Sequence, residues 1–383
     1  MPSTRENALQ KGAYAFNGLG RVSWGGDAVA AVIEAVTRRG AKRVLIVTSP
    51  SLNRASSVPR EAQSALTDLC VGLFDAIQPH TPAPTVDALV ATLRKEKADL
   101  VISFGGGSPI DTVKAALAVL ASGAQSALEI SGKPATWSFA PIRQIAVPTT
   151  LSGAEFSDLA GLTNPQTRIK GGVAGPGIGP AEVILDPKLS LHTPRDLWLS
   201  TGIRAVDHAI ESLCSIAPNP YTDALAAQGL AQLASSLRRT AENPGDLAAR
   251  LQSQQAVWLA SSGLDRTPFG ASHGIGHQLG AVAGVSHGVS SCVLLPAVLD
   301  WNFEQTQEAQ SRIAAILGAS TAAEGVRQLL RDLAQPLRLS DVGVAREQLD
   351  QIAESSLQNR WVRTNPRPIS SVADIREILD AAW

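Results

Sequence analysis

Short apolar runs and amphipathic stretches alternate along the first half of the chain. The runs at 43–48, 100–103 and 143–148 are rich in Val and Ile, and between them apolar residues recur at helical spacing, as at 86–97. Continuous apolar strands are typical of a parallel sheet that is buried on both faces, with helices as its crossover connections. The pattern therefore predicts an α/β unit with a parallel sheet.

The pattern changes near residue 190. From Pro194 onward, long segments rich in Ala and Leu follow one another, such as 223–242 and 246–261, and their spacing indicates amphipathic helices. We predict an α/β domain over residues 1–190 and an all-helical domain over residues 191–383. The glycine-rich segment 170–180 is expected to be irregular, either as a flexible linker or as a stretch that approaches a ligand closely.

The apolar run at 100–103 leads into a glycine turn, which consists of Gly105, Gly106, Gly107 and Ser108. Pro109 and Asp111 follow in positions that suit a first helical turn. Glycines let backbone N–H groups close on an oxyanion, and the positive end of a helix favours it. The turn predicts a phosphate or pyrophosphate site, but it has neither the G-x-G-x-x-G nor the P-loop pattern, and a tight turn without a ligand is the alternative.

Four of the six histidines fall in two short segments of the second half. His273 and His277 are four residues apart, which on a helix places both imidazoles on one face, and His287 follows shortly after. His208 lies upstream on a helix-like stretch. Histidine is both the commonest metal ligand and the side chain that titrates nearest neutrality, so the group indicates a divalent-metal or proton-transfer site. Histidines on a helix surface are the alternative.

Composition and charge fit an enzyme with a small-molecule substrate. The 383 residues are 44% hydrophobic, and the formal net charge of −1 provides no broad basic surface for nucleic acid or an anionic membrane. Three separated cysteines without a C-x-x-C pair favour a cytoplasmic location. The polar start at 1–12 lacks the apolar core of a signal peptide, and no apolar run approaches about 18 residues. We expect neither secretion nor membrane insertion.

In their order along the chain, these segments resemble the iron-type (group III) alcohol dehydrogenases, and most closely the maleylacetate reductases. The resemblance runs from about Phe16 to about Asn302. It rests on the segments 44–48, 105–111, 147–150, 161–163, 186–187 and 208–211 and on the three-histidine segment. The segments 80–82 and 161–163 are similar to the maleylacetate reductases, whereas His287-Gly288 is similar to the general alcohol dehydrogenases.

The resemblance implies a Rossmann-like domain, an all-helical domain, NAD or NADP in the cleft between them, and usually a homodimer. The cofactor-binding residues predicted in this way are Ser49, Gly105, Gly106, Gly107, Ser108, Asp111, Thr149, Thr150 and Lys170. The glycine turn would hold the pyrophosphate, the two threonines would lie on the nicotinamide side, and Lys170 would lie near the ribose. In metal-dependent members an aspartate and three histidines bind the ion, and the histidines correspond to His208, His273 and His287. His277 corresponds to a histidine near the reacting carbon, a candidate proton donor.

The chain departs from the metal-dependent members where their aspartate would be, four residues before His208. It has Arg204 there, and a guanidinium stays charged and cannot ligate a cation. Asp207 would point about 100° away from His208 on a helix, which makes it a poor replacement. We therefore expect no tightly bound iron or zinc, and maleylacetate reductases are understood to work without one.

Arg204 suggests how a carbonyl substrate could be activated without a metal. A guanidinium can bind a substrate carboxylate and stabilise developing oxyanion charge, while His273 or His277 delivers a proton. Our hypothesis is reduction of a small carboxylate-bearing unsaturated or oxo substrate by NADH or NADPH in aromatic-compound catabolism, with His208 in the same catalytic site. In the alternative arrangement Arg204 faces away and forms an ion pair with Asp207 or Glu211.

Three other functions stay open at this point. They are a metal-dependent alcohol or aldehyde dehydrogenase, a lyase of the dehydroquinate-synthase type and a non-catalytic nucleotide-binding relative. NADP also stays open, because Ser49 stands where NAD-preferring sites often have an acid, although it can equally be an ordinary turn residue. The basic segment 360–368 is expected on the surface or in an interface. Residues suggested for the pocket wall by their neighbourhood are Phe156, Leu159, Phe269 and Trp301.

Overall fold

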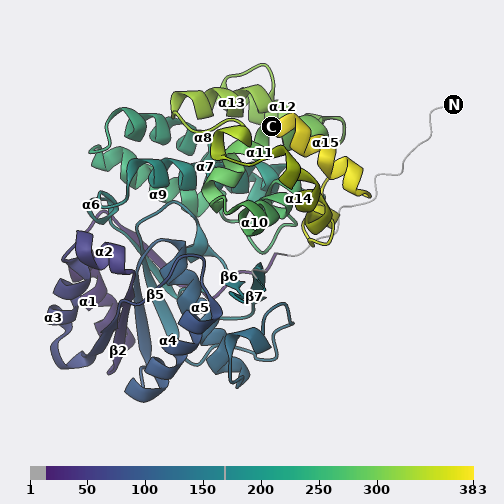
Figure 1. The fold of residues 1–383 in the computed structure, drawn as a ribbon. Helices are drawn as coiled ribbons and strands as arrows, with labels where there is room; N and C mark the ends of the chain where they lie inside the picture. The colour runs from purple at the N-terminus through teal and green to yellow at the C-terminus, as the bar shows by residue number, and fades with distance from the viewer. Residues whose placement is uncertain (1–13, 168–169) are drawn as a thin grey trace.

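The computed structural model describes residues 14–167 and 170–383. The start at 1–12, for which the sequence predicts no signal peptide, lies outside the described residues. Figure 1 shows an α/β part built from the first half of the chain and a helical part built from the second half, in contact along one side. The predicted fold class, a Rossmann-like domain followed by an all-helical domain, is confirmed.

A six-stranded parallel sheet with the order β1-β8-β5-β4-β2-β3 is the centre of the α/β part. Its strands are β1 (Arg21–Trp24), β2 (Val44–Thr48), β3 (Cys70–Phe74), β4 (Leu100–Gly105), β5 (Arg143–Pro148) and β8 (Glu182–Leu185). Strands β2, β4 and β8 are buried along their whole length, and for β2 and β4 this burial is what their apolar composition predicts.

Helices cover both faces of the sheet (Figure 1). They are α1 (Ala28–Arg39), α2 (Pro50–Ala55), α3 (Val58–Leu66), α4 (Ala83–Glu96) and α5 (Gly107–Ser122). Successive side chains of a strand point to opposite faces, so Ile46 and Ile102 share a core with α1 and α3, whereas Leu45 and Val101 share a core with α4 and α5. The two cores therefore follow from the alternation of side chains along continuously apolar strands.

The glycine-rich segment 170–180 is more regular than predicted. Its first residues form β7 (Lys170–Ala174), which pairs with β6 (Leu159–Thr163) in an antiparallel hairpin. The glycines allow close packing: a Cβ at Gly171 would lie 2.2 Å from Ser131 Oγ, and one at Gly175 would lie 2.3 Å from the Trp137 ring. The prediction of an irregular segment was wrong for 170–174, because these residues pair with β6, and it holds for 175–180, which belong to no helix or strand. The side chain of Lys170 lies outside the described part.

After β8, every regular element that the structure describes is a helix. The α-helices are α6 (Pro187–Ser190), α7 (Arg195–Leu213), α8 (Pro220–Glu242), α9 (Leu247–Ala260), α10 (Ala271–Ala283), α11 (His287–Asn302), α12 (Gln307–Leu317), α13 (Ala322–Asp332), α14 (Leu349–Ser356) and α15 (Val372–Ala382). Within the described ranges, none of them is long and apolar enough to cross a membrane. The predicted boundary at residue 190 stays a prediction, although the last strand ends shortly before it.

Helix α7 is the centre of the helical part, because every residue from Trp198 to Leu213 is buried. Its apolar side chains share one core with residues at the end of the sheet, among them Ala146 and Val183. A fully buried helix that also carries charged residues must satisfy them internally. This requirement shapes the site described below.

Helices α8 and α9 pack at a glycine, which provides a test of the helical core. A Cβ at Gly229 would lie 2.6 Å from the backbone nitrogen of Ala260. We expect Gly229→Ala to lower the free energy of unfolding by about 1–3 kcal/mol, although alanine favours helix by about 1 kcal/mol. Urea unfolding measures it, with Gly26→Ala as the control because a Cβ there meets open space. An unchanged or raised stability of Gly229→Ala would contradict this packing.

Candidate active site

A cavity of about 1700 Å³ lies between the carboxyl ends of the strands and the helices α7, α10 and α11. Open parallel sheets bind ligands at this edge, because the loops that follow the strands converge there. Ser49 follows β2, the glycine turn ends β4, and Thr149 and Thr150 follow β5, so three separate loops bring polar groups to one wall.

Most of the residues that the sequence singled out line this cavity. They are Ser49, Gly105, Gly106, Gly107, Ser108, Asp111, Thr149, Thr150, Arg204, His208, His277 and His287. His273 does not line it. Of the four residues suggested for the pocket wall, Leu159 does so, whereas Phe156, Phe269 and Trp301 are buried elsewhere.

The glycine turn is held close against the loop after β5. Gly105 has φ 137°, a conformation that favours glycine, and its carbonyl accepts a hydrogen bond from the Thr149 N–H at 3.0 Å. A Cβ at Gly106 would lie 2.7 Å from Thr150 Cγ2. Helix α5 begins within the turn, at Gly107, so its N-terminal N–H groups and positive dipole end meet the cavity. This geometry suits a diphosphate.

Under the turn lies a buried polar group that the sequence did not reveal. The Lys114 side chain is fully buried, and its Nζ donates to the carbonyl oxygens of Ala154 and Leu159 and to Ser157 Oγ, and lies 3.4 Å from Asp111 Oδ1. Neighbouring Glu155 is also buried, and burial raises the pKa of its carboxyl to about 7. The sequence contains only a weak indication of this site, because a lysine within an apolar helical pattern can be either buried or exposed.

Glu155 makes the stability of the fold depend on pH. Because its pKa is raised from 4.5 to about 7, the folded state holds the proton more tightly than the unfolded state. The resulting contribution to the free energy of unfolding is present in full below pH about 4.5. It decreases by up to about 3 kcal/mol as the pH rises from there through 7. We expect Glu155→Gln to flatten the dependence between pH 5 and 8, as urea unfolding would measure. Parallel curves for the variant and the parent would contradict the raised pKa.

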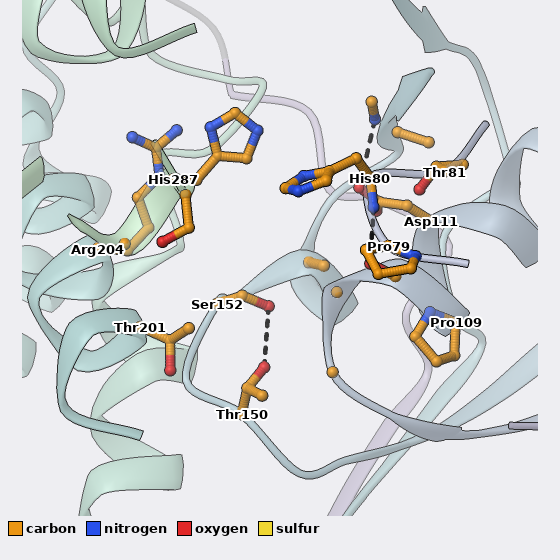
Figure 2. Close-up of a pocket in the computed structure, with 18 of the residues that line it drawn as sticks. Pro79, His80, Thr81, Pro109, Asp111, Thr150, Ser152, Thr201, Arg204 and His287 are labelled. Carbon is orange, nitrogen blue, oxygen red and sulfur yellow. Dashed lines mark hydrogen bonds between the residues drawn. The ribbon is translucent and has the colours of Figure 1, made fainter. Parts of the chain in front are cut away.

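Arg204 lies at the wall of the cavity (Figure 2), and two residues outside the lining of the cavity hold its guanidinium. Its Nη1 donates to Ser291 Oγ at 3.1 Å and lies 3.6 Å from Asp207 Oδ2. The same Asp207 oxygen accepts hydrogen bonds from Ser272 Oγ at 2.8 Å and Ser291 Oγ at 2.6 Å. Burial lowers the pKa of Arg204, but a guanidinium starts so far above neutrality that it stays charged. Arg204 therefore combines the predicted ion pair with a place at the cavity.

His273 and His277 do not act on one common point, although they lie on the same helix. His273 is fully buried, and its Nδ1 lies 2.6 Å from Glu211 Oε2, whereas His277 reaches the cavity. Burial lowers the pKa of His273 and raises that of Glu211, so the imidazole is neutral. The expectation of joint reach was wrong because a buried carboxylate on α7 holds His273 beneath the wall.

His208 contacts both layers of the site. Its ring lies 5.1 Å from that of His273, its Nδ1 lies 3.2 Å from Ser261 Oγ, and the residue lines the cavity. Burial lowers its pKa well below the usual histidine value. His208 is therefore a neutral hydrogen-bonding group rather than a cation at neutral pH.

The predicted metal ligands do not converge. In the described part of the chain, the one group of three possible ligand atoms within 4.8 Å of one another comes from Asp207, Glu211 and His273, not from His208, His273 and His287. Nε2 of His273 is buried without a hydrogen-bond partner, but this one nitrogen alone could not hold a metal ion tightly. The guanidinium of Arg204 lies against Asp207 and would repel a cation there. The residues present do not fit a tightly held iron or zinc ion.

The basic segment 360–368 was expected on the surface, and in part it forms the site instead. Trp361 lines the cavity, and its ring lies 4.7 Å from that of His277 and 5.6 Å from that of His273. Asn359 Nδ2 lies 3.5 Å from His277 Nδ1. The segment fits tightly, since a Cβ at Gly274 would lie 2.6 Å from Val362 Cγ2. Nothing in the sequence linked this segment to the histidines.

The fold and the polar cavity at the strand ends are those of an α/β enzyme with an added helical part, and such sheets bind ligands at this edge. The family model for iron-containing alcohol dehydrogenases matches residues 20–187, and that for the C-terminal part of the Fe-containing alcohol dehydrogenase family matches residues 198–383. The chain belongs to the iron-containing alcohol dehydrogenase family and is an oxidoreductase. Family membership sets aside the lyase and the non-catalytic relative.

The relatives include both branches considered from the sequence. The dehydrogenase ALT3 of Alternaria alternata is 34% identical over 85% of this chain and 95% of its own length. Maleylacetate reductase of Burkholderia cepacia is 29% identical over 95% of each chain. The crystal structure of a 1,3-propanediol oxidoreductase, 28% identical, matches 97% of this chain and 100% of its own with a TM-score of 0.90.

Proposed function

We propose that this chain is a metal-independent, NADH- or NADPH-dependent reductase of the maleylacetate reductase type. Its substrate would be a small carboxylate-bearing unsaturated or oxo compound from the breakdown of aromatic compounds. The observation that carries the proposal is the charged Arg204 at the cavity wall. By resemblance, the metal-dependent members have an aspartate ligand at this position. The maleylacetate reductases among the relatives support the proposal.

Bound NADH or NADPH would supply the hydride, held through its diphosphate by the glycine turn and near its nicotinamide end by Thr149 and Thr150. Arg204 binds the substrate carboxylate or the developing oxyanion through its outward nitrogens, because within the described residues only Nη1 is committed to protein partners. His277 is the side chain placed to supply a proton, since it reaches the cavity and His273 does not. The role of Lys170 near the ribose stays a prediction.

Asp207 and its two serine partners orient the guanidinium. An arginine that is held in one rotamer loses less freedom when it binds a carboxylate than a mobile one. The oriented guanidinium thereby does part of what a Lewis acid does, which is to stabilise negative charge on the substrate oxygen.

Replacing Arg204 tests the proposal directly. With maleylacetate and NADH or NADPH, we expect turnover that a strong chelator does not reduce. We expect Arg204→Ala to lower kcat/KM by about 100-fold or more, and Arg204→Lys to recover only part of it because a lysine cannot form the bidentate fork. Full activity of Arg204→Ala would refute the clamp. Activity that the chelator abolishes and zinc or iron restores would refute metal independence.

A metal-dependent alcohol or aldehyde dehydrogenase is the second candidate. It is favoured by His287, which lines the cavity in a segment that resembles the alcohol dehydrogenases, and by the 1,3-propanediol oxidoreductase relative. It would oxidise a short alcohol in the presence of added metal, which the proposed reductase would not do.

The cavity wall after β2 favours use of NADPH. Ser49 stands where an acid would repel a 2′-phosphate, and its Oγ lies 3.0 Å from Ser51 Oγ. Ser51 and the cationic Arg54 line the same wall. These groups can donate hydrogen bonds to a phosphate, and within the described lining the one carboxylate, Asp111, lies at the start of α5 instead.

Cofactor preference can be reversed at this position. Ser49 accepts a hydrogen bond from the Leu52 N–H at 3.2 Å as the cap of α2, and aspartate is an equally good cap, so the helix should persist in Ser49→Asp. We expect kcat/KM for NADPH to fall by tenfold or more while that for NADH is retained or rises. Equal losses with both cofactors would place the ribose elsewhere.

A homodimer and a cytoplasmic location complete the proposal. Both were inferred from resemblance and composition, and both stay predictions.

A further inference from the structure

His80 reaches the cavity from the α/β part and faces the helices that carry Arg204 and His287. It lies in the loop between β3 and α4, and its ring points toward that of His287, at 6.4 Å between centroids and nearly perpendicular (Figure 2). The two histidines therefore approach each other across the cavity from different parts of the molecule. The mechanism proposed above uses Arg204 and does not use His80.

The backbone at His80 is held in an unfavourable conformation. His80 and Thr81 have φ 65° and φ 51°, and neither is a glycine. The His80 N–H donates to Ser108 Oγ at 3.3 Å, and its carbonyl accepts from Thr163 Oγ1 at 2.7 Å. Thr163 also donates its N–H to the Thr81 carbonyl at 3.0 Å.

Burial of the imidazole does not explain this conformation, because the His80 side chain is exposed at the cavity. Strained positions that are fixed by several independent bonds occur preferentially where a side chain must be presented to a ligand. The bonds here come from the glycine turn and from β6, so His80 is fixed relative to the cofactor-binding wall.

The described wall of the cavity carries an excess of positive charge. Its cationic side chains are Arg54, Lys133, Arg204 and Arg360, and five of the six histidines, His80, His192, His208, His277 and His287, add ring nitrogens that can form hydrogen bonds to an anion. The one carboxylate in it, Asp111, lies 3.4 Å from the Nζ of Lys114. In a protein with a net charge of −1, this concentration indicates ligands with several negative charges.

We propose that His80 is a second anion contact, which binds one carboxylate of a dicarboxylic substrate while Arg204 binds the other. This assignment rests on the proposed function, whose test substrate, maleylacetate, has two carboxylates, and it adds the residue that would distinguish a diacid from a monoacid. An imidazole has a ring N–H to donate in either tautomer, so the contact does not require a protonated ring. Because the two anchors lie on different parts of the chain, a monocarboxylate would lose one of them.

The test compares two substrates and one conservative variant. His80→Asn removes the ring but suits the left-handed backbone, which asparagine adopts more readily than most residues. For maleylacetate we expect kcat/KM to fall about 10- to 100-fold, the usual effect of losing one hydrogen bond to a charged group. We assign to His80 the carboxylate next to the methylene group of maleylacetate. For 4-oxohex-2-enoate, in which a methyl group replaces that carboxylate, we expect less than a twofold change in kcat/KM, and an unchanged KM for NADPH.

Lys97→Asn is the matched control, because Lys97 also has a left-handed backbone, with φ 49°, but is exposed and does not line the cavity. We expect it to leave the preference for the diacid in place. Equal losses on both substrates in His80→Asn, or an equal loss of diacid preference in Lys97→Asn, would overturn the assignment.

Binding of unreactive acids separates this proposal from the proposed function. By isothermal titration calorimetry with NADP⁺ bound, we expect adipate to bind the parent at least tenfold more tightly than hexanoate, and His80→Asn to remove the difference. If maleylacetate is not reduced but this binding pattern holds, the proposed function fails and His80 keeps its role. If adipate binds no better than hexanoate to the parent, the role of His80 is refuted.

Discussion

The buried contact between Arg204 and Asp207 is the constraint on which the site depends. Helix α7 runs through the core of the helical part, and a charged side chain there must find partners. Asp207 is fully buried and takes hydrogen bonds from Ser272 on α10 and Ser291 on α11. One ion pair thus ties together the three helices that form the helical wall of the cavity.

The same contact changes the chemistry expected of the family fold. A cation would have to share the space with a guanidinium that cannot be deprotonated at neutral pH. Glu211 holds His273 beneath the wall, and His208 faces Ser261. What remains at the surface of the cavity is the positive charge of Arg204 beside the neutral imidazole of His208, which suits a carboxylate better than a metal-bound alkoxide.

The two sides of the cavity divide the work. The α/β side offers a glycine turn, a helix N-terminus and two threonines, which suit an anionic dinucleotide. The helical side offers Arg204 and the histidines, and Trp361 from near the C-terminus closes it against His277. His80 belongs to the first side but points toward the second, and its backbone N–H donates a hydrogen bond to Ser108 in the glycine turn, so in the proposed enzyme it would connect cofactor and substrate recognition.

The sequence alone determined three adjacent strands of the sheet, β2, β4 and β5, the helical second half, and a set of site residues most of which line the cavity. Apolar runs and helical spacing are local properties, and the glycine turn and the loop after β5 lie at strand ends, where a parallel sheet brings them together. Tertiary structure decided which histidines reach the cavity, that β7 is a strand, and that Trp361 and His80 belong to the site. Those outcomes depend on contacts such as Glu211 with His273 and Thr163 with His80, which join residues 62 and 83 positions apart. No periodicity in the chain encodes such pairs.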